Sequence, residues 1–128
     1  MPATRMKAVA LTFSLLFPAL VPLAAAPPAP DLENGRRLYA ACAACHNPDA
    51  QPTAGPTLTG VVGRKAGTVP GYRYSRALKN ARTTWDSSTL DPFLADPQAA
   101  LPGNAMPFPG LPDSKERADV IAYLQTLK

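Results

Sequence analysis

The chain has 128 residues and a mass of 13.5 kDa, which leaves room for one domain with a modest core. Its 13 basic and 9 acidic residues give a formal net charge of +4. Arg5 and Lys7 lie in an N-terminal segment that we expect to be removed, which lowers the net charge to +2. Such a weak positive charge gives no reason to expect a nucleic-acid partner.

The N-terminal segment has the pattern of a secretory signal. The uncharged, mostly apolar run over 8–26 follows Arg5 and Lys7 and ends in three alanines. A retained membrane helix is the rival interpretation, but Pro18 and Pro22 interrupt a stretch that is shorter than the roughly 20 residues needed to span a bilayer. We therefore predict a signal peptide over 1–26, a domain over 27–128, and a periplasmic protein without stable membrane insertion.

The first helix of the domain is predicted within residues 31–46, where apolar residues recur at helical spacing after a candidate N-cap, Asp31. Gly35 lies inside it and costs about 1 kcal/mol relative to alanine. The glycine therefore indicates either close approach of another helix or a tolerated interior position.

Residues 47–84 are predicted to be loop because Gly and Pro recur there without strand alternation. A short helix is expected to follow, with Asp91 as N-cap and Pro92 at its first position. After a second proline-rich loop, the last helix is predicted to begin at Asp113, with Glu116 as reciprocal partner in a capping box. Its apolar stripe is Val120, Ile121, Leu124 and Leu127.

These elements predict an all-α domain of three or four helices joined by long loops. Three or four helices joined by such long loops do not bury enough apolar surface to offset the entropy of ordering the chain. We therefore expect a bound group to complete the core.

The segment CAACH holds both cysteines, Cys42 and Cys45, and the only histidine, His46. Structural zinc needs four N or S ligands, and the chain supplies three. A thioredoxin-like redox pair is expected at the start of a helix in a βαβ unit, whereas this pair lies at a helix end. A plain disulfide would leave His46 unexplained.

Covalent haem accounts for all three residues. In Cys-x-x-Cys-His both thiols attach to the haem, and the next residue supplies an iron ligand. One haem c on Cys42 and Cys45, with His46 on the iron, is therefore the predicted cofactor.

The second axial position has one candidate outside the signal segment. With a single histidine, the far side of the iron carries methionine, a weaker ligand or nothing. Met1 and Met6 belong to the signal, which leaves Met106, in the stiff segment PGNAMPFPG. A gap-filling core methionine is the alternative, and the irregular segment disfavours it. Thioether ligation raises the reduction potential, as in electron-transfer cytochromes.

The chain resembles the mitochondrial-type class I cytochrome c family and its bacterial relatives. The resemblance runs across nearly the whole chain after residue 31, through CAACH, GPTLTGVVGRKAG, PGYRYS, PGNAM and RADVIAYL. It implies a small cytochrome c fold, in which Gly35 and Tyr39 pack against the last helix. It also implies roles for further residues: the Pro56 carbonyl accepts from the His46 ring, and the haem propionates are held by Arg64, Tyr74, Trp85 and Asn104.

The family's function implies a one-electron carrier, not an enzyme, that works as a monomer between periplasmic or membrane-bound redox protein partners. The alternative is a haem subunit held permanently in a dehydrogenase or oxidase. A third possibility, a ligand sensor or weak peroxidase, requires Met106 to leave the iron.

Three departures from the family pattern bear on mechanism. Phe93 and Leu78 stand where the family has a tyrosine and an asparagine near the methionine ligand, and both make that side drier. The lysines that surround the family's haem edge are largely missing, so electron transfer is expected to depend weakly on ionic strength.

The basic stretch over 64–82 is interpreted as a solvated loop face.

Overall fold

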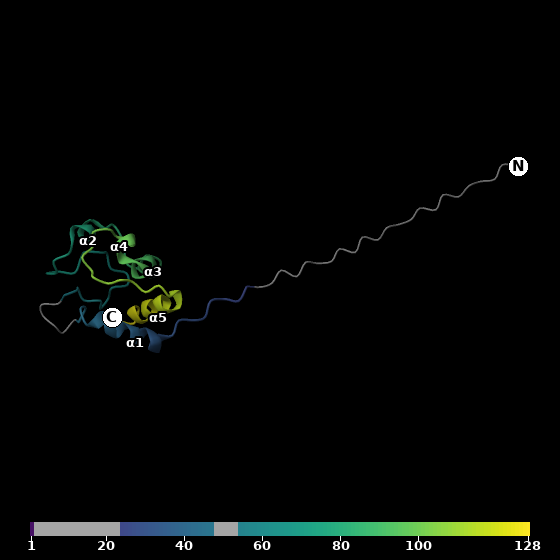
Figure 1. Cartoon of the computed structure of the whole chain (residues 1–128), viewed down its shortest axis with the longest axis horizontal. Helices are drawn as coiled ribbons and strands as arrows, with labels where there is room; N and C mark the ends of the chain where they lie inside the picture. The colour runs from purple at the N-terminus through teal and green to yellow at the C-terminus, as the bar shows by residue number, and fades with distance from the viewer. Residues whose placement is uncertain (2–23, 48–53) are drawn as a thin grey trace.

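The computed structural model describes Met1 and residues 24–47 and 54–128. The predicted signal peptide lies mostly outside these residues. The described residues form five helices (Figure 1): α1 (Leu32–Ala43), α2 (Arg76–Asn80), α3 (Ser87–Ala95), α4 (Pro97–Ala100) and α5 (Ser114–Leu124). The only β-type pairing among them is an isolated antiparallel bridge between Lys65 and Thr84. The predicted all-α class is confirmed, although the structure has more helices than the three or four expected.

Two helices begin at the predicted capping residues. The Asp31 carboxylate accepts hydrogen bonds from the backbone N–H groups of Glu33 and Asn34 at the start of α1. The Asp113 carboxylate likewise accepts from the first turn of α5. Each carboxylate satisfies N–H groups that have no partner within the helix. Glu116 makes no return hydrogen bond among the described residues, so only half of the predicted capping box forms.

The predicted start of the middle helix is wrong. Helix α3 begins at Ser87, where Asp86 and Thr89 form a complete capping box, and Pro92 lies inside the helix. An interior proline removes one backbone hydrogen bond and costs about 3 kcal/mol. The burial of Leu90, Phe93 and Leu94 on the same short helix offsets that cost. Tertiary packing thus outweighs the local rule used for the prediction.

Two regions predicted to be loop contain short helices. Helix α2 has 5 residues and begins after Ser75, whose hydroxyl accepts from the Leu78 N–H. Helix α4 has 4 residues, with Asp96 as N-cap and Pro97 at its first position. One turn of helix shows too little apolar periodicity to be recognised among Gly and Pro residues. Cap chemistry at Ser75 and Asp96 was the available signal.

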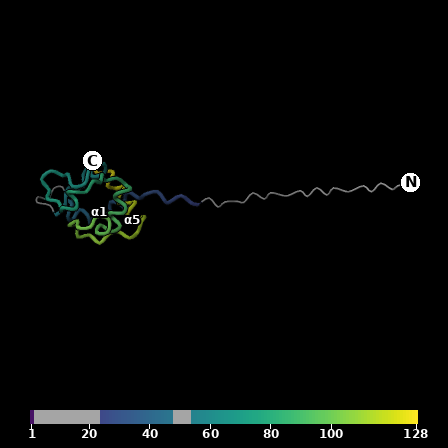
Figure 2. Tube along the Cα trace, turned by 90° about the horizontal axis from the view of Figure 1, so that it is seen from above, coloured from purple at the N-terminus to yellow at the C-terminus, as the bar shows by residue number. Residues whose placement is uncertain are grey.

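Helices α1 and α5, from opposite ends of the domain, lie side by side in both views (Figures 1 and 2). Gly35 is buried at their contact, and a Cβ there would overlap the Asp119 backbone carbonyl. Tyr39 packs on Tyr123 with ring centroids 5.1 Å apart. The prediction that Gly35 permits close approach of another helix is confirmed.

A buried carboxylate fastens this crossing. Asp119 on α5 is 0% exposed. Its carboxylate accepts from Lys115 Nζ at 2.5 Å, Asn34 Nδ2 at 2.8 Å and the Asp31 N–H at 2.7 Å. These hydrogen bonds, led by that from Lys115, lower the pKa of Asp119 to about 2. The ionised carboxylate therefore ties the start of α1 to α5.

The apolar core lies where α3 packs against α5 and is small. The buried apolar side chains of the described residues are Val61, Ala66, Leu90, Phe93, Leu94, Val120, Ile121 and Leu124. A further ring of large apolar side chains, among them Trp85 and Phe108, packs against this core and stays half-buried. Among the described residues, no helix combines the length and the hydropathy that a membrane span requires.

Candidate haem site

The CAACH segment forms the end of α1 and the turn after it. The Cys42 carbonyl accepts hydrogen bonds from the N–H groups of both Cys45, at 3.1 Å, and His46, at 2.9 Å. Cys42 is half-buried and Cys45 is exposed. This turn places the two thiols and the imidazole at one end of α1, with the thiols accessible for covalent attachment.

The His46 ring is held by the segment that follows it. Its Nδ1 lies 2.6 Å from the Pro56 carbonyl oxygen. Because a carbonyl oxygen only accepts, Nδ1 carries the hydrogen and Nε2 keeps a lone pair. The Gly55 N–H donates to the Cys45 carbonyl at 2.8 Å, which fixes this segment against the turn. The imidazole is therefore oriented with Nε2 as its metal-binding atom.

Gly55 packs its backbone against the face of that ring. A Cβ at this position would lie 2.6 Å from both Cε1 and Nδ1 of His46. Contacts this short do not occur between real Cβ atoms and their neighbours, so only glycine fits. Sequence reasoning missed Gly55 as a site residue, although its position directly before Pro56 was the available signal.

The rival chemistries for this segment have little structural support. Among the described residues, no three His, Cys, Asp or Glu side chains come together to hold a metal ion. Cys42 and Cys45 are free thiols. Burial raises the pKa of the Cys42 thiol, whereas the reactive cysteine of a redox pair has a lowered pKa. Zinc and thiol–disulfide chemistry are both disfavoured.

The segment around Met106 is held by hydrogen bonds to a buried asparagine. Asn104 is 6% exposed, and its amide donates to the carbonyls of Pro97 at 2.7 Å and Leu101 at 2.9 Å. Its side-chain oxygen accepts from the Met106 N–H at 2.9 Å. Gln98, which sequence reasoning did not identify, donates to the Asn104 carbonyl. Met106 is thus half-buried on a fixed backbone.

The residues that the family resemblance assigns to the haem propionates differ in the hydrogen bonds they already make. Arg64 donates to the carbonyls of Thr59 and Thr57. The Tyr74 hydroxyl accepts from the Val69 N–H at 3.2 Å and keeps its own hydrogen for donation. The Trp85 ring packs against the Phe93 ring in a tilted arrangement, with ring centroids 4.9 Å apart. The indole N–H of Trp85 has no hydrogen-bond partner among the described residues. Tyr74 and Trp85 therefore retain donors for an acidic group.

Asn104 differs from that pair. Both hydrogens of its amide are donated to carbonyls within its own segment. The structure gives it a part in shaping the Met106 segment, and a propionate contact for Asn104 remains a prediction.

The described residues fit a covalently bound haem. The oriented Nε2 of His46 is a suitable iron ligand, and the adjacent thiols are free. Large apolar side chains beside the small core stay half-buried, and a large flat apolar group would add to their burial where it contacts them: Leu38, Tyr39, Leu58, Val62, Trp85, Phe108, Leu111 and Leu127. The iron-binding and thiol side chains and the incompletely buried core are therefore both consistent with a bound haem.

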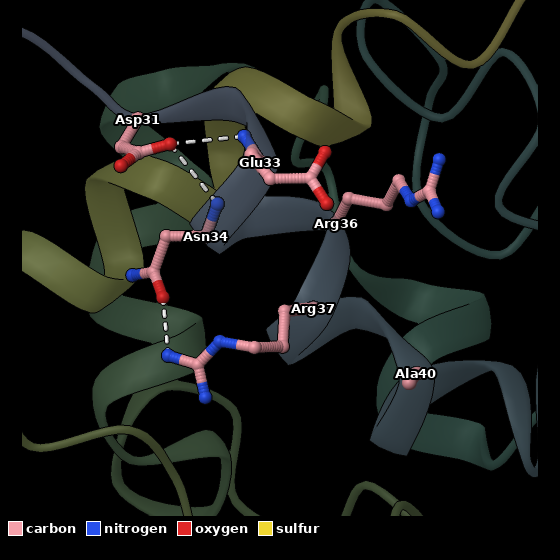
Figure 3. A pocket seen from close by; sticks show the side chains of 6 residues that line it. All are labelled: Asp31, Glu33, Asn34, Arg36, Arg37 and Ala40. Atoms are coloured by element: carbon pink, nitrogen blue, oxygen red, sulfur yellow. Dashed lines mark hydrogen bonds between the residues drawn. The ribbon is translucent and has the colours of Figure 1, made fainter.

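One surface depression lies elsewhere, beside the first turns of α1 (Figure 3). It is lined by Asp31, Glu33, Asn34, Arg36, Arg37 and Ala40. Arg37 donates to the Asn34 side chain across it. This charged and open lining is unsuited to a flat apolar cofactor.

Comparison with known proteins finds cytochromes c. The family model described as Cytochrome c matches residues 32–128. Cytochrome c2 of Rhodomicrobium vannielii is 45% identical over 119 residues, covering 91% of this chain and 95% of the relative. Cytochrome c of Euglena viridis is 45% identical over 100 residues, covering 77% and 98%. The solved structure of cytochrome cH from Methylobacterium extorquens is 48% identical, with a TM-score of 0.71, covering 75% and 98%.

Proposed function

This chain belongs to the cytochrome c family of haem-bearing electron carriers, and we propose that it carries single electrons on one haem c bound by His46 and Met106. Its relatives are named as cytochromes and are electron carriers, not enzymes. The observation that supports the ligand assignment best is the hydrogen bond from His46 Nδ1 to the Pro56 carbonyl. It leaves Nε2 free to bind iron.

Cys42 and Cys45 hold the cofactor through two thioether bonds. When bound, the haem supplies an iron centre that changes by one electron between its ferrous and ferric states. The chain has one Cys-x-x-Cys-His segment, so it attaches one such group. Half-buried apolar residues such as Leu58 and Phe108 exclude water around it.

The two proposed iron ligands, His46 and Met106, are positioned by different means. His46 is oriented by the Pro56 carbonyl, which also raises the basicity of the imidazole. Met106 is held through its backbone N–H by Asn104. A thioether on this side favours the ferrous state and raises the potential. If His46 and Met106 both bind the iron, no iron position would remain for a substrate, which favours electron transfer over catalysis.

Tyr74 and Trp85, which keep donors among the described residues, are proposed to bind the haem propionates together with Arg64. Burying a carboxylate is costly unless hydrogen bonds or charges compensate it. The Arg64 guanidinium already donates to two carbonyls, so its position beside such a group would be fixed in advance.

We propose that residues 1–26 are removed on export and that 27–128 work in the periplasm as a monomeric respiratory-chain carrier. The support is the signal pattern of the sequence and its similarity to bacterial cytochromes c2. Gel filtration of the native protein tests the alternative of a permanent subunit. Elution with a catalytic subunit would favour that alternative over a free carrier.

Visible spectroscopy of the purified holoprotein tests the ligand assignment. The ferric protein is expected to show the weak long-wavelength band of methionine-ligated haem, and Met106→Ala to lose it. Phe108→Leu, two residues away, is a matched control that keeps both ligands and should keep the band. A wild-type protein without the band, or an unchanged Met106→Ala spectrum, would contradict methionine ligation.

A further inference from the structure

Charge is unevenly distributed along the described chain. Residues 54–85 contain six basic residues and no acidic one. Residues 31–47 and 86–128 together contain five basic and eight acidic residues. The small net charge of the protein therefore hides a positive region and a negative region.

Four of the six basic residues form what we call the α2 basic patch: Lys65, Arg76, Lys79 and Arg82, all of them exposed. Arg76 and Lys79 are three residues apart on α2, so they share a helix face. Lys65 pairs with Thr84, which follows Arg82 by two residues. The backbone of Gly67 packs against Leu78 and Lys79 and joins these segments. The three segments that carry the four residues are therefore adjacent in the fold.

The patch lies on the side of the domain away from α1 and α5. Figure 1 shows α2 at the opposite end of the folded part from α1 and α5. Asp113, Glu116 and Asp119 belong to α5 or its cap, whereas Asp86, Asp91 and Asp96 belong to α3 or to the caps of α3 and α4. Positive charge gathered on one surface would steer an approaching acidic partner toward it.

No acidic side chain neutralises the patch within the described residues. The ion pairs there are Lys115–Asp119 and Arg117–Asp91, and neither involves the patch. Arg64, in the same stretch, differs because its guanidinium is used on backbone carbonyls. The four patch side chains are therefore available to an external group.

The patch borders the segment that leads to Met106. Ala77, between Arg76 and Lys79, lies against Gly103: a Cβ on that glycine would be 3.8 Å from the Ala77 Cβ. Tyr72 and Tyr74 stack edge to face just before α2, and both hydroxyls are hydrogen-bonded within the protein. Arg and Tyr are the residue types enriched in protein interfaces.

We propose that the α2 basic patch is a docking surface for a carboxylate-rich face of a redox protein partner, an inference that rests on the proposed electron-carrier function. Arginine guanidinium groups bind carboxylates in a bidentate geometry, which suits a protein surface. Large apolar side chains that could enter a lipid surface are absent from the patch, since those exposed in the described residues are Met1 and Leu32. The absence of such side chains favours an acidic protein over a membrane.

This docking surface differs from the lysine-ringed haem edge of the family. The missing lysines predict that electron transfer depends weakly on ionic strength, whereas docking through this patch predicts a stronger dependence. Docking through exposed charges weakens with added salt.

Binding of poly-L-glutamate to the holoprotein, measured by calorimetry at low salt, tests the proposal. Arg76→Gln/Lys79→Gln is expected to weaken binding about five- to tenfold. Arg36→Gln/Arg37→Gln is the matched control, because it removes the same charge from another helix face, and it should weaken binding by less than about twofold. Equal losses in the two double variants, or no loss in the first, would overturn the proposal.

A second experiment, with lipid vesicles, tests whether the patch binds an anionic membrane instead of an acidic protein. Vesicles of phosphatidylglycerol and phosphatidylcholine are tested by co-sedimentation with the same proteins. We expect weak binding that both double variants lower equally, as for net charge alone. A selective loss of vesicle binding in Arg76→Gln/Lys79→Gln, larger than its loss of polyglutamate binding, would assign the patch to lipid and overturn the proposal.

Failure of this proposal is distinguishable from failure of the electron-carrier assignment. Arg76→Gln/Lys79→Gln should keep the wild-type absorption spectrum and reduction potential, because neither residue contacts the proposed iron ligands. Met106→Ala should instead change the spectrum and keep polyglutamate binding. A spectral change in the patch variant would show that its loss of binding has another origin, which would overturn the assignment of the patch as a separate surface.

Discussion

The crossing of α1 and α5 and the two segments that would face the haem iron are held in different ways. The crossing is closed by contacts within the protein: Gly35 lies against the Asp119 backbone, and Val120 is 1% exposed. These two segments carry half-buried His46 and Met106. The His46 ring is held by the Pro56 carbonyl, and the Met106 N–H is held by the Asn104 side-chain oxygen. The crossing is complete as a packed unit, whereas the iron-facing half leaves apolar surface for a cofactor to bury.

This difference determines where substitutions should act. In the crossing, an added methyl group has no free volume to enter, so the effect appears as lost stability. Around the iron, a lost hydrogen bond changes how a ligand is oriented, so the effect appears first in the spectrum and the potential. Each prediction below alters one of the two regions.

The largest effect is expected from Gly35→Ala, which breaks the crossing. The new Cβ would overlap the Asp119 carbonyl, so α1 and α5 must separate. We expect a loss of about 3 kcal/mol in the free energy of unfolding, measured by urea denaturation of the holoprotein. Arg36→Ala, on the exposed neighbouring residue, should change stability by less than about 0.5 kcal/mol. Similar values for the two variants would show that the crossing tolerates a side chain.

Gly55→Ala tests the histidine side of the iron. Its Cβ would lie 2.6 Å from two atoms of the His46 ring, so the imidazole must rotate away from the Pro56 carbonyl. We expect a destabilisation of about 2 kcal/mol together with a changed reduction potential, measured by redox titration. Thr59→Ala, an exposed change in the same segment, is the control. An unaltered potential in Gly55→Ala would count against a positioning role for Gly55.

Asn104→Ala tests the methionine side. It leaves the Pro97 and Leu101 carbonyls without their amide donor and frees the Met106 N–H. We expect a loss of about 1–2 kcal/mol and a weaker methionine–iron band in the ferric spectrum. Ala99→Ser, exposed on α4, serves as control. Full retention of the band would mean that Met106 is positioned without Asn104.

The smallest expected effect concerns Asp119, whose contribution to stability is present at neutral pH and is lost in acid. Because its folded-state pKa is lowered to about 2, its contribution to stability is complete above the unfolded value of about 4 and is lost as pH falls toward 2. Urea midpoints of the wild type should therefore fall through this window. Asp119→Asn should show a shallower fall from a lower starting point. Parallel pH profiles would exclude Asp119 as the titrating group.

Local signals were sufficient to predict part of the fold and the centre of the site. Asp31 and Asp113 were identified as N-caps because capping depends on a residue and the next turn of chain. CAACH indicated haem because the attachment chemistry lies within five consecutive residues. The start of α3 was mispredicted, because the burial of Leu90 and Phe93 that outweighs the interior Pro92 is a property of the packed domain.

The sequence by itself determined the cofactor chemistry, the one histidine and the one methionine available to bind iron after residue 26, and the helical class. Only the tertiary structure decided that Gly55 fits against the His46 ring, that Asp119 fastens α1 to α5, and that Lys65 and Arg82 join α2 in one basic patch. The physical reason is separation along the chain. Covalent attachment and capping act over a few residues, whereas close packing and charge clustering depend on which distant segments the fold brings into contact.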